Sequence, residues 1–125
     1  MTPQQIEENL NRIKAELESE VSREDISAIQ DKMLRLITFM GLSAEIMRYT
    51  KSLVLHKQQH VISANKSGDM SPSILKQYIE SELSFELALH SYSERLNAAI
   101  SHATDSLRSI LSLYKTELST SIIQR

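Results

Sequence analysis

Apolar residues recur along most of the chain at the three- and four-residue spacing that is typical of amphipathic α-helices. The longest seam keeps alternating steps of three and four residues from Ile26 to Val61. A polar segment, NKSGDMSPS, then separates it from a further apolar seam. The pattern predicts an all-α protein with helices over about residues 3–20, 23–65 and 72–119.

Residues that commonly begin helices stand in front of each predicted helix. Thr2 is followed by Pro3 and, three residues after Thr2, by a glutamine, which together are the signature of a capping box. Ser22 is the predicted N-cap of the second helix, and Ser71 before Pro72 is the predicted N-cap of the third. These signals place three helix starts independently of the apolar pattern.

The short connection between the second and third helices predicts an antiparallel hairpin, on which the short first helix packs. At 1.5 Å per residue, the second helix extends roughly 63 Å and the first roughly 27 Å. The first helix should therefore cover the start of the second helix and the end of the third, leaving the hairpin around residues 45–95 two helices thick. We expect an elongated helical bundle that forms a single domain over residues 1–125.

Apolar positions beyond the main seam predict that the thin part of this hairpin associates with itself or with a partner. A second apolar stripe runs beside the first, and a two-helix arm cannot bury both stripes by itself. The alternative is a hairpin that breaks at Gly41 and folds back into a compact four-helix monomer. The predicted interface residues of a homo-oligomer are Leu42, Ile46, Tyr49, Leu53, Phe85 and Leu89.

The composition narrows the classes of function that suit this shape. The chain carries 14 Lys and Arg against 16 Asp and Glu, so its formal net charge of −2 gives no overall attraction to nucleic acid or anionic lipid. Cysteine is absent, which excludes disulfides and favours a reducing cytoplasm. No apolar run reaches the roughly 18–20 residues of a membrane span, so we expect a cytoplasmic protein without a membrane partner.

The charges are unevenly distributed between the two arms of the predicted hairpin. Residues 46–68 contain basic but no acidic residues, and residues 77–94 contain acidic but no Lys or Arg residues. One interpretation is that these charges pair across the hairpin and fix its register. The other is a basic stripe that follows the phosphates of single-stranded DNA, with a tyrosine stacking on a base. The predicted nucleic-acid-binding residues are Arg48, Tyr49, Lys51, His56, Lys57, His60 and Lys66.

Two histidines raise the question of a metal site. His56 and His60 share one face of the second helix, and Glu82 lies opposite them in a hairpin that turns near residue 69. The pair lacks the intervening glutamate of the HExxH motif, and no glycine-rich loop surrounds it to hold a substrate. We therefore predict no metal and no cofactor. No nucleophile with a base stands out either, so we predict no catalytic residue, no enzyme activity and no small-molecule substrate.

Two segments give the chain a resemblance to a known family, LSAEIMRYTKSLVLHKQQ in the second helix and YSERLNAAISHATDSLRSILSLYKTEL in the third. With the short acidic first helix, they resemble the recombination mediator proteins of T-even-type phages, and the likeness covers about residues 25–118. The chain departs from that family in lacking a tryptophan in the third helix. The resemblance implies a non-catalytic, ring-forming accessory protein of a phage or mobile element that binds single-stranded DNA and a recombination partner.

Two functions thus remain open from the sequence. The first is the oligomeric accessory protein that binds single-stranded DNA and a recombination protein. The second is a structural or adaptor protein whose coiled-coil-like seams serve self-association or protein binding, with no nucleic-acid role. The basic residues of the second helix separate the two functions, because only the first requires them to face phosphates.

Overall fold

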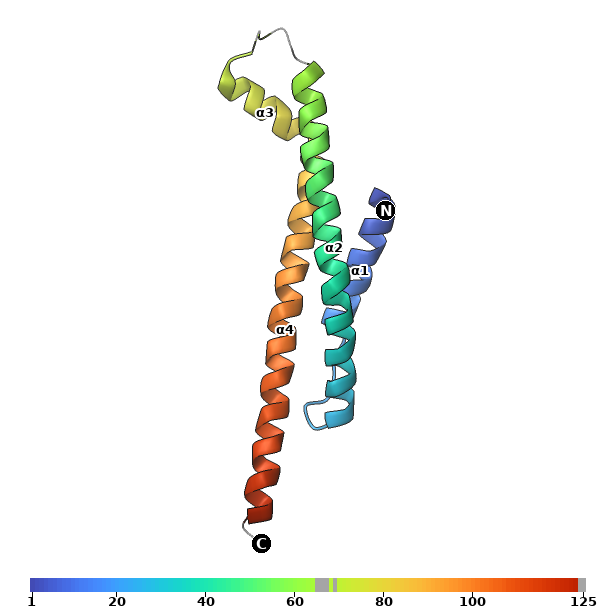
Figure 1. Ribbon diagram of the computed structural model, residues 1–125, viewed down its shortest axis with the longest axis vertical. Helices are drawn as coiled ribbons and strands as arrows, with labels where there is room; N and C mark the ends of the chain where they lie inside the picture. The colour runs from blue at the N-terminus through green and yellow to red at the C-terminus, as the bar shows by residue number, and fades with distance from the viewer. Residues whose placement is uncertain (65–67, 69, 124–125) are drawn as a thin grey trace.

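The computed structural model describes residues 1–64, 68 and 70–123, and this part of the chain forms four α-helices and no strands. Figure 1 shows a rod in which α2 and α4 run side by side, α1 lies along α2, and α3 turns away at the far end. The predicted all-α fold, a short N-terminal helix packed on a long helical hairpin, is confirmed. The bounds are Pro3–Glu18 for α1, Ile26–Ala64 for α2, Pro72–Glu82 for α3 and Ser84–Ile123 for α4.

The N-terminal helix α1 begins at the predicted capping box. The Thr2 hydroxyl accepts a hydrogen bond from the Gln5 backbone N–H at 3.2 Å, and the Gln5 side chain accepts one from the Thr2 N–H at 2.8 Å. These two bonds satisfy donors that a helix start otherwise leaves without partners. The helix ends at Glu18, earlier than predicted, where the Ser19 hydroxyl donates to the Glu16 carbonyl oxygen at 2.7 Å.

The long helix α2 begins at Ile26 and not at the predicted residue 23, because its N-cap is Asp25 and not Ser22. The Asp25 carboxylate accepts from the Ala28 N–H at 3.0 Å, and the Asp25 carbonyl oxygen accepts from the Ile29 N–H at 3.0 Å. The Ser22 hydroxyl instead accepts from the Glu24 N–H at 3.3 Å, in the turn that precedes the helix. A capping carboxylate binds the helix N-terminus with its charge as well as its hydrogen bond.

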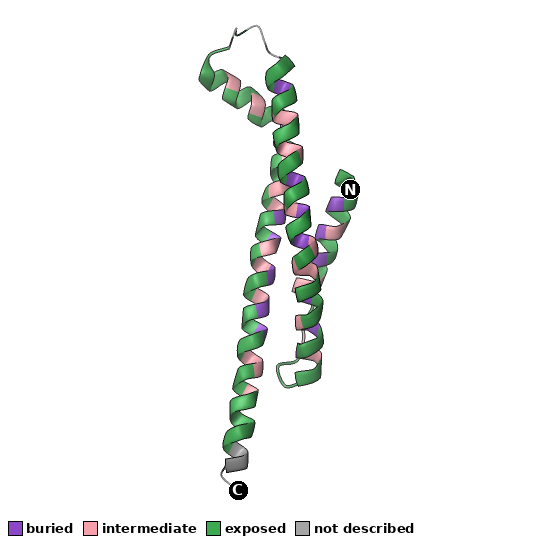
Figure 2. Ribbon diagram, in the orientation of Figure 1, coloured by how far each residue is buried: buried purple, intermediate pink, exposed green. Residues whose placement is uncertain are grey.

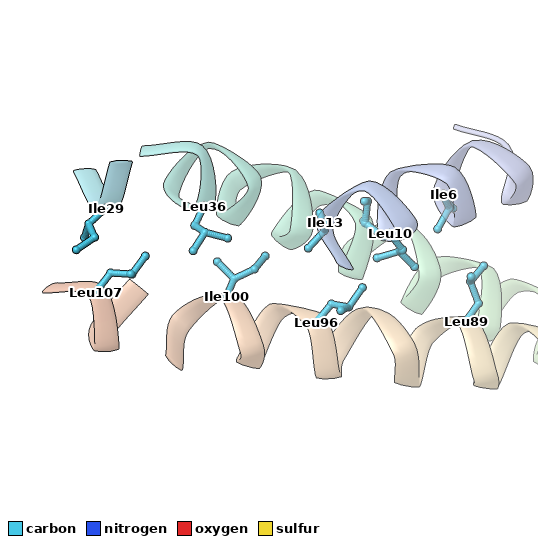
Figure 3. Packing of buried hydrophobic residues seen from close by; sticks show 10 residues of the cluster. Ile6, Leu10, Ile13, Ile29, Leu36, Leu89, Leu96, Ile100 and Leu107 are labelled. Carbon is cyan, nitrogen blue, oxygen red and sulfur yellow. The ribbon is translucent and has the colours of Figure 1, made fainter. Parts of the chain in front are cut away.

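The two long helices meet through residues that recur every seven positions, as in an antiparallel coiled coil. In Figure 3, Ile29 points toward Leu107, and Leu36 points toward Ile100. All four side chains are buried in one hydrophobic cluster. Burial of this kind contributes roughly 25 cal/mol per Å² of apolar surface, so these layers hold the hairpin together at the end away from α3.

The same seven-residue series turns polar along the half of the hairpin nearer α3. The Ser43 hydroxyl donates to the Asn97 side-chain oxygen at 3.0 Å, and the Thr50 hydroxyl lies 3.2 Å from that of Ser93. Ser43, Thr50 and Ser93 are fully buried, so these hydrogen bonds replace the water that folding removes. The Thr50 and Ser93 hydroxyls can also donate within their own helices, to the Met47 and His90 carbonyl oxygens. Sliding one helix along the other would therefore break the bonds between the helices and leave Ser43 without its partner, so the polar layers favour the observed register.

The position of α1 agrees with the prediction only in part. Its C-terminal end lies beside the start of α2, where Glu16 pairs with Arg35, but its N-terminal end reaches the middle of α2, and it packs on the first half of α4 and not on the end of the predicted third helix. Its buried side chains Ile6 and Leu10 belong to one cluster with Ile46 and Leu89, and the Tyr92 hydroxyl donates to Asn11 at 3.4 Å. The reason is the path of the chain. Since α1 and α2 are joined by a tight connection and run in opposite directions, the start of α1 reaches the middle of α2 (Figure 1).

This position of α1 reduces the number of predicted interface residues that are exposed and could bind a second copy. Ile46 is fully buried and Leu89 is 7% exposed, so the chain's own core occupies both, and neither is free to bind a second copy. Leu42 and Leu53 are partly buried against the same core. Tyr49 and Phe85 remain exposed. Figure 2 shows that buried positions gather where α1, α2 and α4 lie together, while α3 and the C-terminal part of α4 are mainly exposed.

The predicted third helix over 72–119 is wrong as a single helix, because it divides at Leu83 into α3 and α4. Leu83 has φ −99° and ψ 9°, which turns the chain although its N–H still bonds to the Ile79 carbonyl oxygen at 3.0 Å. The turn leaves Leu83 only 1% exposed, whereas α3 has no buried residue. The break therefore places one leucine in the core at the cost of helix continuity. Beyond it, α4 extends past the predicted residue 119 to Ile123.

The helix α2 continues through Gly41, so the alternative of a break and a compact monomer does not hold for this fold. Gly41 has an ordinary helical conformation, and a Cβ added there would meet no atom within 4 Å. Neither the backbone nor the packing within the chain thus requires glycine. An exposed glycine inside a helix lowers helix stability by roughly 1 kcal/mol relative to alanine.

We predict that Gly41→Ala raises the free energy of unfolding by about 1 kcal/mol, because it removes the conformational freedom of glycine without a steric clash. Urea unfolding followed by circular dichroism of dilute protein measures the change. The matched control is Ala44→Gly at another exposed position of α2, which should lower the free energy by about the same amount. A loss of stability in Gly41→Ala would contradict the open environment of this residue.

Candidate functional site

The candidate site is the part of α2 that carries the predicted basic stripe, and the structure divides these residues between different roles. Lys57 is paired within the hairpin, since its Nζ lies 2.9 Å from Glu86 Oε1. The Glu86 side chain is 16% exposed, and its other carboxylate oxygen is buried without a hydrogen-bond partner. Lys57 therefore neutralises a poorly solvated carboxylate, as the interpretation of charge pairing across the arms predicts. Lys66 lies outside the described residues.

Arg48 and Lys51 are exposed, and neither forms an ion pair or a hydrogen bond within the described part of the chain. Three shallow hollows adjoin around Arg48 on the surface of α2. Tyr49 lines the first, His90 and Glu94 line the second together with Lys51, and His56 lines the third. The structure thus brings Arg48, Lys51, Tyr49 and His56 around one continuous surface, and it leaves Lys57 out. His60 is exposed and lines none of these three hollows.

Acidic side chains reduce the positive charge of this surface. Glu45 lines the first hollow beside Arg48, and Glu94 lines the second beside Lys51. Each free cation therefore has a carboxylate in its neighbourhood, although no ion pair forms. A phosphate chain approaching this surface meets a nearly balanced set of charges, in contrast to the uninterrupted basic stripe that the sequence predicts.

A polar cluster that runs from the buried Thr50 to the exposed Glu94 at this surface was missed by the sequence reasoning. The Thr50 hydroxyl lies 2.7 Å from His90 Nδ1, and His90 Nε2 lies 2.8 Å from Glu94 Oε1. The Ser93 hydroxyl donates to the His90 carbonyl oxygen at 2.7 Å. A hydroxyl, an imidazole and a carboxylate in a row resemble a catalytic arrangement, but Thr50 is fully buried and no substrate can reach its oxygen. The signal in the sequence was polar residues at seven-residue spacing within an apolar seam.

A second surface of α2 is apolar and exposed, and we call it the outer face. It consists of positions that lie seven residues apart, about 140° around the helix from those that contact α4, although the side chain of Arg48 lines a hollow to which α4 also contributes. Three of them are large apolar residues, Leu34 at 61%, Leu55 at 50% and Ile62 at 46% exposure. Gly41 and Arg48, which lie between Leu34 and Leu55 in this series, are exposed as well. The outer face is defined by Leu34, Gly41, Arg48, Leu55 and Ile62.

The two histidines do not contact Glu82, the residue considered as a third ligand. Glu82, the last residue of α3, makes no ion pair or hydrogen bond with His56 or His60. Among the residues that the structure describes, no three His, Cys, Asp or Glu side chains lie together so that they could hold a metal ion. Across the same residues, no helix has the length and apolar character to cross a membrane.

Comparison with known proteins adds no family or activity to this geometry. No protein-family model matches the chain, and no curated protein or solved structure matches it. The resemblance to phage recombination mediators, the single-stranded-DNA role and the recombination partner therefore stay predictions. The function has to be argued from the surfaces of α2.

We predict that Lys57→Glu lowers the free energy of unfolding by about 2 kcal/mol, because it places a second carboxylate against the poorly solvated Glu86. The matched control is Lys51→Glu, which makes the same charge change six residues earlier and should alter stability by less than about 0.5 kcal/mol. Thermal and urea unfolding at neutral pH, on protein dilute enough to be monomeric, measure both variants. Equal effects of the two substitutions would show that Lys57 has no special structural role.

Proposed function

We propose that this chain is a non-catalytic helical assembly protein that associates with copies of itself through exposed faces of its hairpin. The observation that carries this proposal is that α2 uses one side for its own core and exposes the large apolar residues Leu34, Leu55 and Ile62, multiples of seven residues apart, on another side. Helices with two such sides normally have two partners, since exposed apolar surface of this kind marks interfaces. This conclusion favours the structural or adaptor function of the two that the sequence leaves open.

Further exposed apolar residues support assembly as the role. Ile74 and Tyr78 of α3 and Phe85 of α4 are 56%, 38% and 54% exposed, although α3 packs on no other described element strongly enough to bury a residue. The long, thin shape leaves a large share of each helix without a neighbour from the same chain (Figure 2). A rod with apolar sides suits a scaffold whose sides are completed by other helices.

We expect the mass of the wild-type protein to rise above the 14.2 kDa of one chain as its concentration increases, when it is measured by analytical ultracentrifugation. The double variant Leu34→Glu with Leu55→Glu should stay monomeric and keep its helical content, because both leucines are at least half exposed. The matched control, Leu113→Glu with Leu118→Glu, changes two equally exposed leucines of α4. A wild-type chain that stays monomeric into the high micromolar range would overturn the proposal.

Single-stranded DNA binding is the second candidate function, and one observation favours it. Arg48 and Lys51 lack partners and share a surface with the exposed ring of Tyr49. Two free cations beside an exposed aromatic ring are the elements of a surface that holds a phosphate chain and stacks a base. The nearby carboxylates of Glu45 and Glu94 limit its strength, so repeated copies in an assembly would have to supply the affinity.

If DNA binding occurs here, fluorescence anisotropy of a labelled single strand should show affinity that falls with salt, with a slope of about −1.4 for two phosphate contacts per chain. Arg48→Glu with Lys51→Glu should abolish binding. Lys14→Glu with Lys115→Glu makes the same charge change at exposed positions elsewhere and should weaken binding only slightly. Absence of binding by the folded wild-type protein at low salt would discard this candidate.

A further inference from the structure

We propose that the outer face of α2 binds the same face of a second copy of this chain, with the two α2 helices antiparallel and a two-fold axis beside Arg48. This inference rests on the proposed function and names its partner, surface and orientation. It follows from three properties of the outer face. They are its angular position on α2 relative to the residues that contact α4, the order of its large apolar and small residues, and the charged residues beside it.

The outer face lies opposite both helices that pack on α2 within the chain. Residues that contact α4 recur every seven positions, from Ile29 and Leu36 to Thr50 and Lys57. Each outer-face residue follows one of these positions by five residues, which is a rotation of about 140° around the helix. Since both series repeat every seven residues, that rotation stays the same along the whole of α2. The outer face is therefore a continuous stripe that drifts by roughly 20° for every seven residues, and a second helix can follow it by coiling around α2.

The apolar and small positions of the outer face complement each other when two copies are antiparallel around Arg48. Leu34 then lies opposite Ile62 of the second copy, and Gly41 lies opposite Leu55. Gly41 is an exposed helical glycine for which nothing within the chain gives a reason. Opposite a leucine, the missing side chain leaves the space into which that leucine packs, as small residues do where helices approach closely. The second copy thus explains a residue that the monomer does not.

The charges select the antiparallel orientation. Glu45, at the edge of the outer face, makes no ion pair within the described chain, and neither does Lys51 on the other side of Arg48. In the antiparallel pair, Glu45 of each copy lies opposite Lys51 of the other and diagonal to the other Arg48. The two Arg48 side chains face each other at the two-fold axis, as they also would in an in-register parallel pair, so this like-charge contact does not distinguish the two orientations. In a parallel pair, Glu45 would face Glu45 and Lys51 would face Lys51. Such like-charge contacts disfavour the parallel alternative.

Cross-linking tests the orientation directly, because the chain has no cysteine of its own. We would make Gly41→Cys and Leu55→Cys as separate variants and treat each alone, and then their mixture, with a short bis-maleimide. The antiparallel pair predicts efficient linking in the mixture and little in either variant alone, since equivalent positions in the two copies are roughly 20 Å apart. A parallel pair predicts the reverse. Linking within each single variant, with none added by mixing, would overturn the orientation.

Exchanging the charges of Glu45 and Lys51 tests whether these two residues face each other across the dimer. Glu45→Lys and Lys51→Glu should each weaken dimerisation roughly tenfold, measured by sedimentation, because each places like charges opposite one another. The double variant Glu45→Lys with Lys51→Glu restores opposite charges and should dimerise more tightly than either single variant. If the double variant is the weakest of the three, Glu45 does not face Lys51 of the other copy. Circular dichroism confirms that all variants are folded.

The outcomes also separate this inference from the proposed function. The protein could self-associate in the centrifuge while positions 41 and 55 do not cross-link and the double variant does not regain dimerisation. That result overturns the outer-face dimer and leaves assembly through another surface. A wild-type chain that is monomeric at every concentration overturns both. Self-association with both results supports the antiparallel dimer.

Discussion

The packing of α2 against α4 is the contact on which the rest of this structure depends. It joins the two longest helices through positions seven residues apart, apolar at one end and polar at the other. The apolar layers supply most of the burial, whereas the hydrogen bonds between buried polar side chains of the two helices favour the observed register. Because this contact keeps one side of α2 turned to α4 along the whole hairpin, it also determines which residues of α2 face outward.

Each of the surfaces discussed for function is a consequence of that arrangement. The packing of α1 on the hairpin takes Ile46 and Leu89 out of any interface. The polar half of the hairpin takes Lys57 out of any phosphate-binding stripe by pairing it with Glu86. Arg48, Lys51 and the apolar residues of the outer face are among the residues of α2 that remain free. A second copy and a nucleic acid would compete for Arg48 and Lys51, so the two candidate functions exclude one another at this surface.

The sequence was sufficient to predict the helices, but not to predict which helices pack side by side. The spacing of apolar residues placed α1 and α2 to within a few residues, and the capping box at Thr2 is confirmed atom by atom. Periodicity says which side of a helix is apolar, but it does not say which other helix covers that side, and this is why Ile46 was assigned to an interface. The sequence around Leu83 contains no glycine or proline that would indicate a break in the helix. Its cause is burial of one leucine, which depends on the fold as a whole.

The order of layers along the hairpin also bears on how the chain folds. The sequence separation of paired residues grows from 29 at Lys57 and Glu86, beside the connection, to 91 at Arg23 and Tyr114. Closing the longer loop costs only about 1 kcal/mol more, yet the layers nearest the connection are the polar ones and gain little when they form first. Residues of α1 and α2 pair over much shorter separations, as Lys32 with Ser19 and Arg35 with Glu16. We therefore expect α1 and α2 to form the folding nucleus, onto which α4 docks from its apolar end.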